Sequence, residues 1–198
     1  MFPIFLKLEG RRCLVVGAGT VAEGKIRGLL ESGALIEVVA PKAVFQVRRW
    51  EWEGKLTWKP RSFDPRDLDN VSIVIAATNS QELNSQIFRE ARLRNVLCNA
   101  VDDPENCDFY YPAVVKRGDL QIAISTNGRS PALAQRLRQE LEEQFGPEYE
   151  AWVEELGETR EQLNTATLDS EARKKLLHRL ASREAFNNRS VVQRGRSN

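Results

Sequence analysis

Apolar residues in the first half of the chain gather into short runs that alternate with segments of helical periodicity. Residues 21–32 and 79–94 show the helical spacing, whereas nearly every position in the intervening runs is apolar. Unbroken apolar runs are typical of parallel strands covered on both faces, and we expect such strands at residues 13–16, 35–40, 71–77 and 96–101. The alternation predicts an α/β fold over residues 1–111, a Rossmann-type doubly wound parallel sheet.

The pattern changes after residue 111, and residues 112–146 predict a small α+β segment. Arg117-Gly118-Asp119 links two short strand patterns in the manner of a hairpin. Ser130-Pro131 combines an N-cap residue with a proline at the first helical position, which predicts a helix that Gly146-Pro147 ends.

The remaining residues are strongly charged. Residues 147–186 carry Leu and Trp at helical intervals, which predicts two or three amphipathic helices in a helical C-terminal domain. Residues 187–198 are polar and contain several arginines, so we expect a flexible tail there.

Composition excludes several classes of protein. The chain has 198 residues, 41% hydrophobic and 29% charged, with a net charge of +1, which fits a soluble globular protein without nucleic-acid or membrane partners. Its three cysteines form no CxxC pair, which favours reduced thiols in the cytoplasm and offers no zinc site or other metal site. We find neither a signal peptide nor an apolar run long enough to cross a bilayer, and therefore expect a cytoplasmic protein.

The first candidate site is the loop that follows the first predicted strand. Gly17, Gly19 and Ala22 fit the pattern G-x-G-x-x-G/A between a strand and a helix. The first glycine permits a tight turn, the second lets the backbone approach a pyrophosphate, and the small third residue allows close packing of helix on strand. The helix start then presents N–H groups to the anion, although a glycine turn that binds nothing is the alternative.

The acid that binds the ribose in many dinucleotide-binding folds is missing from the end of the second strand. That strand ends at Ala40-Pro41-Lys42, and Glu37 falls in its middle. Cofactor contacts there would come from the backbone near Pro41 and Lys42, and Lys42 would also tolerate a 2′-phosphate. These residues alone therefore leave NAD and NADP open.

Two acids, Asp102 and Asp103, directly follow the predicted strand at residues 96–101. Ligands of open α/β sheets bind at the carboxyl ends of the strands, so these acids reach the same edge as the glycine loop. An acid placed there can take a proton while a nicotinamide accepts a hydride. The alternative is that Asp-Asp-Pro only forms a turn after the strand.

Residues 125–131 form a second polar loop before a helix start, where Asn127-Gly128 permits positive φ and N–H donors can hold a carboxylate. A plain loop with a good N-cap is the alternative. His178 lies among basic residues on a helical segment and is expected to be a surface residue.

Four segments together resemble the precorrin-2 dehydrogenase family, which includes the N-terminal module of siroheme synthase. They are GAGTVAEGK, VVAP, IAATNSQELN and CNAVDDPENCDFYYPAVVKRGDLQIAISTNGRSPALAQRLRQELE, and the resemblance covers about residues 1–145 in the family's order.

The resemblance implies oxidation of precorrin-2 to sirohydrochlorin with NAD, in the biosynthesis of siroheme or a related tetrapyrrole. It implies that Asp102 is the general base and that the chain forms homodimers through residues 112 to about 145. The cofactor contacts would be Gly17, Gly19, Thr20, Val21, Ala22, Pro41, Lys42 and Thr78. Some relatives also insert ferrous iron into sirohydrochlorin, so a bifunctional enzyme is one alternative and a non-catalytic NAD- or tetrapyrrole-binding module is another.

Cationic and polar residues after residue 111 suit the carboxylates of such a substrate. We expect its contacts to be Lys116, Arg117, Asn127, Gly128, Arg129 and Ser130. Asn127-Gly128-Arg129 departs from the family's usual Gly-Gly-Lys or Gly-Gly-Thr.

Overall fold

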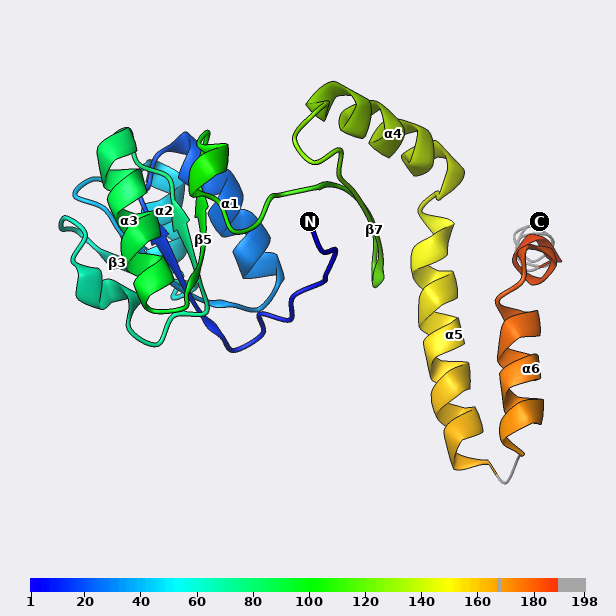
Figure 1. Ribbon diagram of the computed structural model, residues 1–198. Coiled ribbons are helices and arrows are strands. Elements are labelled where there is room, and N and C mark those ends of the chain that lie inside the picture. Colours follow the sequence, from blue (N-terminus) through cyan, green and yellow to red (C-terminus); the bar gives the residue numbers. More distant parts are fainter. Residues whose placement is uncertain (167–168, 189–198) are drawn as a thin grey trace. The chain divides into compact units, whose positions relative to one another are not determined.

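The computed structural model describes residues 1–166 and 169–188 of the chain. By its internal contacts the chain divides into two compact units, Met1–Tyr111 and Pro112–Asn198 (Figure 1). We call them unit 1 and unit 2.

Unit 1 is built on a five-stranded parallel sheet with the strand order β3-β2-β1-β4-β5. Its strands are β1 (Arg12–Val16), β2 (Leu35–Val39), β3 (Thr57–Lys59), β4 (Ile73–Ala76) and β5 (Leu97–Ala100). The connecting helices are α1 (Thr20–Glu31), α2 (Phe45–Trp52) and α3 (Gln81–Leu93), with short 3-10 turns η1 (Pro65–Leu68) and η2 (Pro104–Asn106). The chain moves outward from β1 to β3 and then returns to β4 on the other side of β1, which is the doubly wound topology expected from the sequence.

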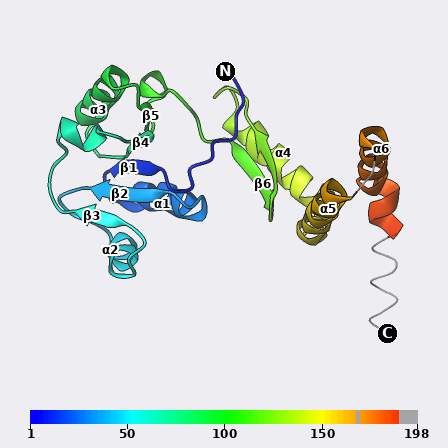
Figure 2. The same cartoon turned by 90° about the horizontal axis from the view of Figure 1, so that it is seen from below.

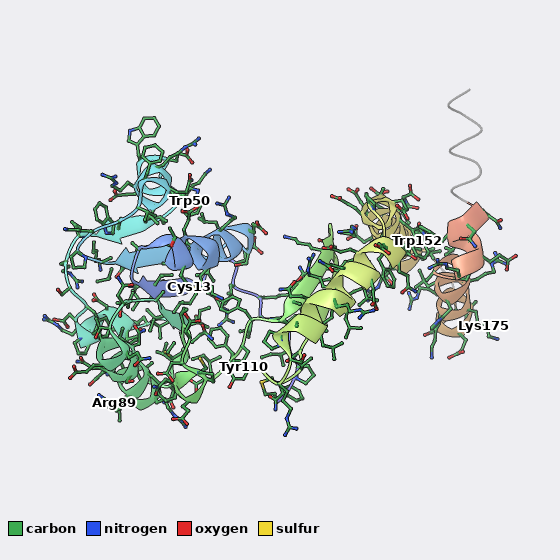
Figure 3. The ribbon with its side chains drawn as sticks, turned by 90° about the horizontal axis from the view of Figure 1, so that it is seen from above. Cys13, Trp50, Arg89, Tyr110, Trp152 and Lys175 are labelled. Atoms are coloured by element: carbon green, nitrogen blue, oxygen red, sulfur yellow. The ribbon has the colours of Figure 1, made fainter. Side chains whose placement is uncertain are left out.

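Apolar side chains cover both faces of this sheet, which explains why its strands are almost continuously apolar. On one face, Ile26 of α1 and Trp50 of α2 pack in a cluster that includes Cys13 of β1. On the other face, Ile87 of α3 and Leu68 of η1 pack in a second cluster. Figure 2 shows α1 and α2 on one side of the strands and α3 on the other, and Figure 3 labels Cys13 and Trp50. The predicted α/β class is confirmed.

Two elements of unit 1 were absent from the sequence prediction. Strand β3 has only three residues, Thr-Trp-Lys, and gives no apolar run. Helix α2 starts without a side-chain cap and buries only Val47 and Trp50, so its apolar face is narrow. The predicted elements end within a few residues of the observed ones. For example, α3 starts at Gln81 because the Ser80 hydroxyl accepts a hydrogen bond from the Leu83 amide (3.2 Å).

Unit 2 begins with the antiparallel hairpin of β6 (Ala113–Arg117) and β7 (Leu120–Ile124). The helices that follow are α4 (Pro131–Gln144), α5 (Glu148–Thr165) and α6 (Ser170–Leu180), and both α4 and α5 contact the hairpin. Residues 183–188 are also helical, so Asn187 and Asn188 belong to a helical turn, and the rest of the expected tail lies outside the described residues. Among the described helices, none combines the length and apolar character that crossing a membrane requires.

Aromatic residues join the helices of unit 2. Tyr149 of α5 is buried and packs against the rings of Phe145, Trp152 and Phe186 at centroid distances of 4.6–5.5 Å. The Arg183 guanidinium also donates a hydrogen bond to the Tyr149 hydroxyl (2.9 Å). These contacts hold residues 183–188 against α5.

Candidate active site

The carboxyl ends of the central strands of unit 1 lie level with one another. Val16 of β1 pairs with Val39 of β2 and with Ala76 of β4, and Ala76 pairs in turn with Ala100 of β5. The loops after these strands therefore share one edge of the sheet. Strands are added on one side of β1 up to β3 and then on its other side from β4, so the strand order reverses between β1 and β4. Open α/β sheets bind their ligands at such a point.

The glycine loop after β1 lies tightly against the end of β4. Gly17 has φ +107°, a conformation that favours glycine. A Cβ atom there would overlap the carbonyl oxygen of Ala77 and lie 2.6 Å from its carbonyl carbon. The Gly17 amide donates to the carbonyl of Val39 (3.0 Å), which ties the loop to β2 as well. Gly17 is thus required by the packing of the sheet edge.

Gly19 has a different role, because a Cβ atom at this position would meet nothing within 4 Å. Gly19 is the N-cap of α1, and no side chain caps the helix. Thr20 and Val21 at the helix start are exposed, whereas Ala22 is fully buried against the sheet. Open space above an uncapped helix start fits the pyrophosphate of a dinucleotide, since its N–H groups and helix dipole favour an anion.

The end of β2 carries no free acid. The Glu37 carboxylate accepts a hydrogen bond from the Lys59 ammonium (2.6 Å) and lies 3.7 Å from the Arg12 guanidinium. Pro41 and Lys42 are exposed just beyond the strand. A ribose bound here would meet the backbone and side chains of Pro41 and Lys42 rather than the carboxylate of Glu37.

Thr78 follows β4 and is held by Asn84 of α3. The Thr78 hydroxyl donates to the Asn84 side-chain oxygen (2.7 Å), and the Asn84 side-chain amide donates back to the Thr78 carbonyl (3.2 Å). Asn84 is only 3% exposed. Sequence reasoning missed Asn84, although its place in IAATNSQELN, one turn after an N-cap serine, puts a polar side chain on the buried face of a helix.

The two acids after β5 differ in their surroundings. Asp102 is exposed and has φ +59°, and the preceding Val101 amide donates to the Ala76 carbonyl of β4 (2.9 Å). Asp103 is half-buried, and its carboxylate accepts a hydrogen bond from the Asn106 side-chain amide (2.6 Å). Asp103 therefore stabilises the turn, while the Asp102 carboxylate faces solvent at the sheet edge.

Lys25 of α1 is a second residue that sequence reasoning missed. Its ammonium lies 3.5 Å from the centroid of the Tyr111 ring. Burial lowers the pKa of Lys25, and the negative charge of Asp102 opposes this change. Lys25 ends the segment GAGTVAEGK, but only the fold brings it to the chain that follows β5.

In unit 2, the loop after β7 adopts the conformation that its sequence permits. Asn127 has φ +55° and Gly128 has φ +76°. The Ser130 hydroxyl caps α4 by accepting from the Leu133 amide (3.3 Å). Arg129 is exposed beside them.

Arg117 of β6 binds the end of α4. Its guanidinium donates to the carbonyls of Phe145 (2.9 Å), Glu142 (3.1 Å) and its neighbour Lys116 (2.9 Å). Arg117 thus binds the C-terminal carbonyls of α4, where a cation is favoured by the helix dipole. Contact of Arg117 with the substrate stays a prediction, and Lys116, its neighbour on β6, is exposed.

His178 is exposed in the last turn of α6, in agreement with its predicted surface position. Across residues 1–166 and 169–188, the side chains of His, Cys, Asp and Glu form no group of three suited to a metal ion.

Two families of known proteins match successive parts of the sequence. A family described as putative NAD(P)-binding matches residues 4–113, and a family described as the central part of sirohaem biosynthesis proteins matches residues 117–144. The solved structure of SirC, a precorrin-2 dehydrogenase, is 30% identical and superposes with a TM-score of 0.82, covering 100% of both chains.

Curated siroheme synthases are also similar. That of Photorhabdus laumondii is 43% identical over 140 residues, covering 71% of this chain and 30% of the relative. Siroheme synthase 1 of Aeromonas hydrophila is 37% identical over 182 residues, covering 92% of this chain and 39% of the relative. The chain thus spans only about a third of the length of these synthases.

Proposed function

Because the chain belongs to the precorrin-2 dehydrogenase family, we propose that it oxidises precorrin-2 to sirohydrochlorin and uses NAD as the oxidant. The observation that carries this proposal is the shared sheet edge. The exposed carboxylate of Asp102 follows β5, and the glycine loop with its uncapped helix start follows β1, two strands away. A proton acceptor and a dinucleotide site on one edge are what a dehydrogenase needs.

The cofactor contacts that we propose come from all three loops around the switch point. Gly17 permits the tight turn against the end of β4, Gly19 allows the backbone to approach the pyrophosphate, and the amides of Thr20 and Val21 start the helix that faces it. Ala22 keeps this helix close to the sheet. Pro41 and Lys42 line the ribose region after β2, and Thr78 lines the region after β4, where Asn84 fixes its hydroxyl.

When bound, NAD supplies the acceptor for the hydride that leaves precorrin-2. Asp102 takes the proton that leaves with it, so that two electrons and two hydrogens are removed in total. Its exposed position lets the carboxylate release this proton to water after each turnover. Asp103 acts only through the turn that it stabilises.

In unit 2 we propose that Lys116, Asn127, Gly128, Arg129 and Ser130 bind carboxylates of the substrate. Lys116 and Arg129 are exposed cations, and the positive φ angles of Asn127 and Gly128 precede the start of α4. We further propose that the protein is a cytoplasmic homodimer joined through residues 112 to about 145.

An anaerobic assay with purified protein, precorrin-2 and NAD tests the function. We expect the absorbance of sirohydrochlorin to appear with one NADH per product, and no product when NAD is omitted. A later addition of ferrous iron shows whether metal insertion is faster than without protein. If the spectrum of precorrin-2 does not change while NAD binds, the chain is a binding module and the proposal is wrong.

A further inference from the structure

The loop that follows β3 borders an open hollow in unit 1. The hollow measures about 500 Å³, and residues between Lys59 and Asp67 line it, among them Arg61, Ser62 and Phe63. Ligand pockets in proteins usually measure about 300–1,000 Å³, so the hollow is large enough for a planar ring system. The cofactor contacts proposed above include none of these residues.

This hollow adjoins the place where we put the ribose of the cofactor. Strand β3 is the neighbour of β2 in the sheet (Figure 2), and the Ala40 amide donates to the Lys59 carbonyl (3.2 Å). The Trp58 indole N–H donates to the Ala40 carbonyl (3.0 Å). Ala40 directly precedes Pro41 and Lys42, so the hollow begins beside the ribose region at the carboxyl edge of the sheet.

Arg61 brings a fixed guanidinium plane to the hollow. Its Nη1 donates to the Asp67 carboxylate (2.8 Å), and its Nη2 donates to the other oxygen of the same carboxylate. The Asp67 side chain is only 5% exposed and also accepts from the Asp64 amide (2.9 Å). Burial disfavours the charge of Asp67, but these hydrogen bonds prevail and lower its pKa. Two parallel bonds to a buried anion fix the plane of the guanidinium, while 43% of the Arg61 side chain stays exposed.

The other charges around the hollow favour a neutral ring over a free anion. The Lys59 ammonium lies 2.6 Å from the Glu37 carboxylate. The Arg66 guanidinium lies 2.8 Å from the Asp64 carboxylate. Each cation that lines the hollow thus has a carboxylate beside it, which leaves little net positive charge to attract a phosphate. The face of a guanidinium nevertheless stacks well on a flat ring system.

We propose that the adenine of the cofactor lies in this hollow and stacks on the guanidinium of Arg61. Adenine is bonded directly to the ribose, so its site must adjoin the ribose site, and the hollow does. Adenine is neutral and flat, and proteins stack such bases on arginine planes. This inference rests on the proposed function, because it specifies the adenine end of the same cofactor site.

Calorimetric titration with NAD tests the inference in wild type, Arg61→Lys and Arg49→Lys. Lysine keeps a cation beside the buried Asp67 but has no planar face, so Arg61→Lys should bind NAD at least about fivefold more weakly. ADP-ribose, which carries the adenosine but not the nicotinamide, should lose affinity by the same factor. Arg49 pairs with Glu53 (2.7 Å) in the last turn of α2, so Arg49→Lys is a matched control and should bind NAD like wild type.

Ser62→Trp is a second variant, which leaves the ion pairs of the hollow in place. Ser62 is exposed on the wall of the hollow, so an indole there should occupy the adenine site and weaken NAD binding. Thermal unfolding shows whether each variant is folded. If Arg61→Lys does not fold, Ser62→Trp decides, and wild-type affinity in that protein overturns the inference.

Two other results would also overturn it. If Arg61→Lys folds and binds NAD and ADP-ribose like wild type, the pair with Asp67 only stabilises the loop. If Arg61→Lys weakens the binding of NADP but not of NAD, the hollow holds a 2′-phosphate instead of the base.

Binding without turnover separates this inference from the proposed function. If wild type binds NAD without oxidising precorrin-2, and Arg61→Lys binds NAD more weakly, the function fails and the adenine site stands. If wild type is active and its affinity for NAD is unchanged in Arg61→Lys, the adenine site alone fails. In an active enzyme we expect KM for NAD to rise in Arg61→Lys while kcat at saturating NAD is retained, as the loss of a uniform binding contact predicts.

Discussion

Gly17 offers the sharpest test of the glycine loop, because the structure separates its role from that of Gly19. In Gly17→Ala, the new Cβ would overlap the Ala77 carbonyl oxygen and lie 2.6 Å from the carbonyl carbon, on a backbone with φ +107°. The left-handed conformation costs an L-residue about 1–2 kcal/mol, and overpacking against a fixed backbone costs about 1–3 kcal/mol. We expect the free energy of unfolding to fall by about 2–5 kcal/mol and Tm by about 4–20 °C.

Two matched alanine variants in the same loop and helix serve as controls. Gly24 of α1 has open space around its Cβ position, so Gly24→Ala should stabilise the helix by up to about 1 kcal/mol. Gly19→Ala should leave stability within about 0.5 kcal/mol, since its backbone is extended and unobstructed. Its methyl group would nevertheless project where we place the pyrophosphate, so NAD should bind at least tenfold more weakly.

Thermal unfolding followed by circular dichroism measures the stabilities, and calorimetric titration at low temperature measures NAD binding. If the Tm of Gly17→Ala equals that of Gly24→Ala, the close approach of the loop after β1 to the end of β4 is refuted. A Gly19→Ala protein with wild-type affinity would refute the placement of the cofactor over the helix start.

Three further outcomes are expected. Arg117→Ala should lower the free energy of unfolding by about 1–2 kcal/mol, measured by urea denaturation, because the last carbonyls of α4 lose their donor; a raised KM at unchanged stability would contradict this. Asn84→Ala should cost about 1–3 kcal/mol and weaken NAD binding through Thr78, whereas loss of stability alone would remove Thr78 from the cofactor site. Burial raises the pKa of Cys13 to about 11 and of Cys98 to about 12, so the unfolded state loses these thiol protons at lower pH than the folded state. The free energy of unfolding should therefore fall as pH rises above about 9. Urea denaturation that gives the same free energy of unfolding from about pH 8 to 10 would contradict the burial of these thiols.

Much of unit 1 was predictable because its strands and helices carry their own local signals. Strand β4 is a continuous apolar run, and α3 has a capping serine and an amphipathic face, so both can be located without a structure. Strand β3 carries no such signal, since three residues with mixed exposure look like any loop. Strand β3 forms because the free edge of β2 offers backbone partners for its three residues.

The residues of the candidate site also include some that the sequence predicts and some that it does not. The glycine loop and Asp102 follow from sequence because each is adjacent to a strand end, and strand ends of a parallel sheet meet at one edge. The contacts of Lys25 with Tyr111 and of Asn84 with Thr78 escape such reasoning, because they depend on which loop packs against each helix. Arg117 shows the converse: its charge suggested a ligand, but the end of α4 lies within its reach and takes its hydrogen bonds.

The central claim is that Asp102 accepts the proton during oxidation of precorrin-2, and the neighbouring acid supplies the control. In the anaerobic assay with NAD, Asp102→Asn should lower kcat by at least about 100-fold, the contribution expected of a general base, without changing the affinity for NAD. Asp103→Asn should retain most of the wild-type rate, because the Asp103 carboxylate is engaged by Asn106 in the turn. Wild-type turnover in Asp102→Asn, or an equal loss in both variants, would contradict the account.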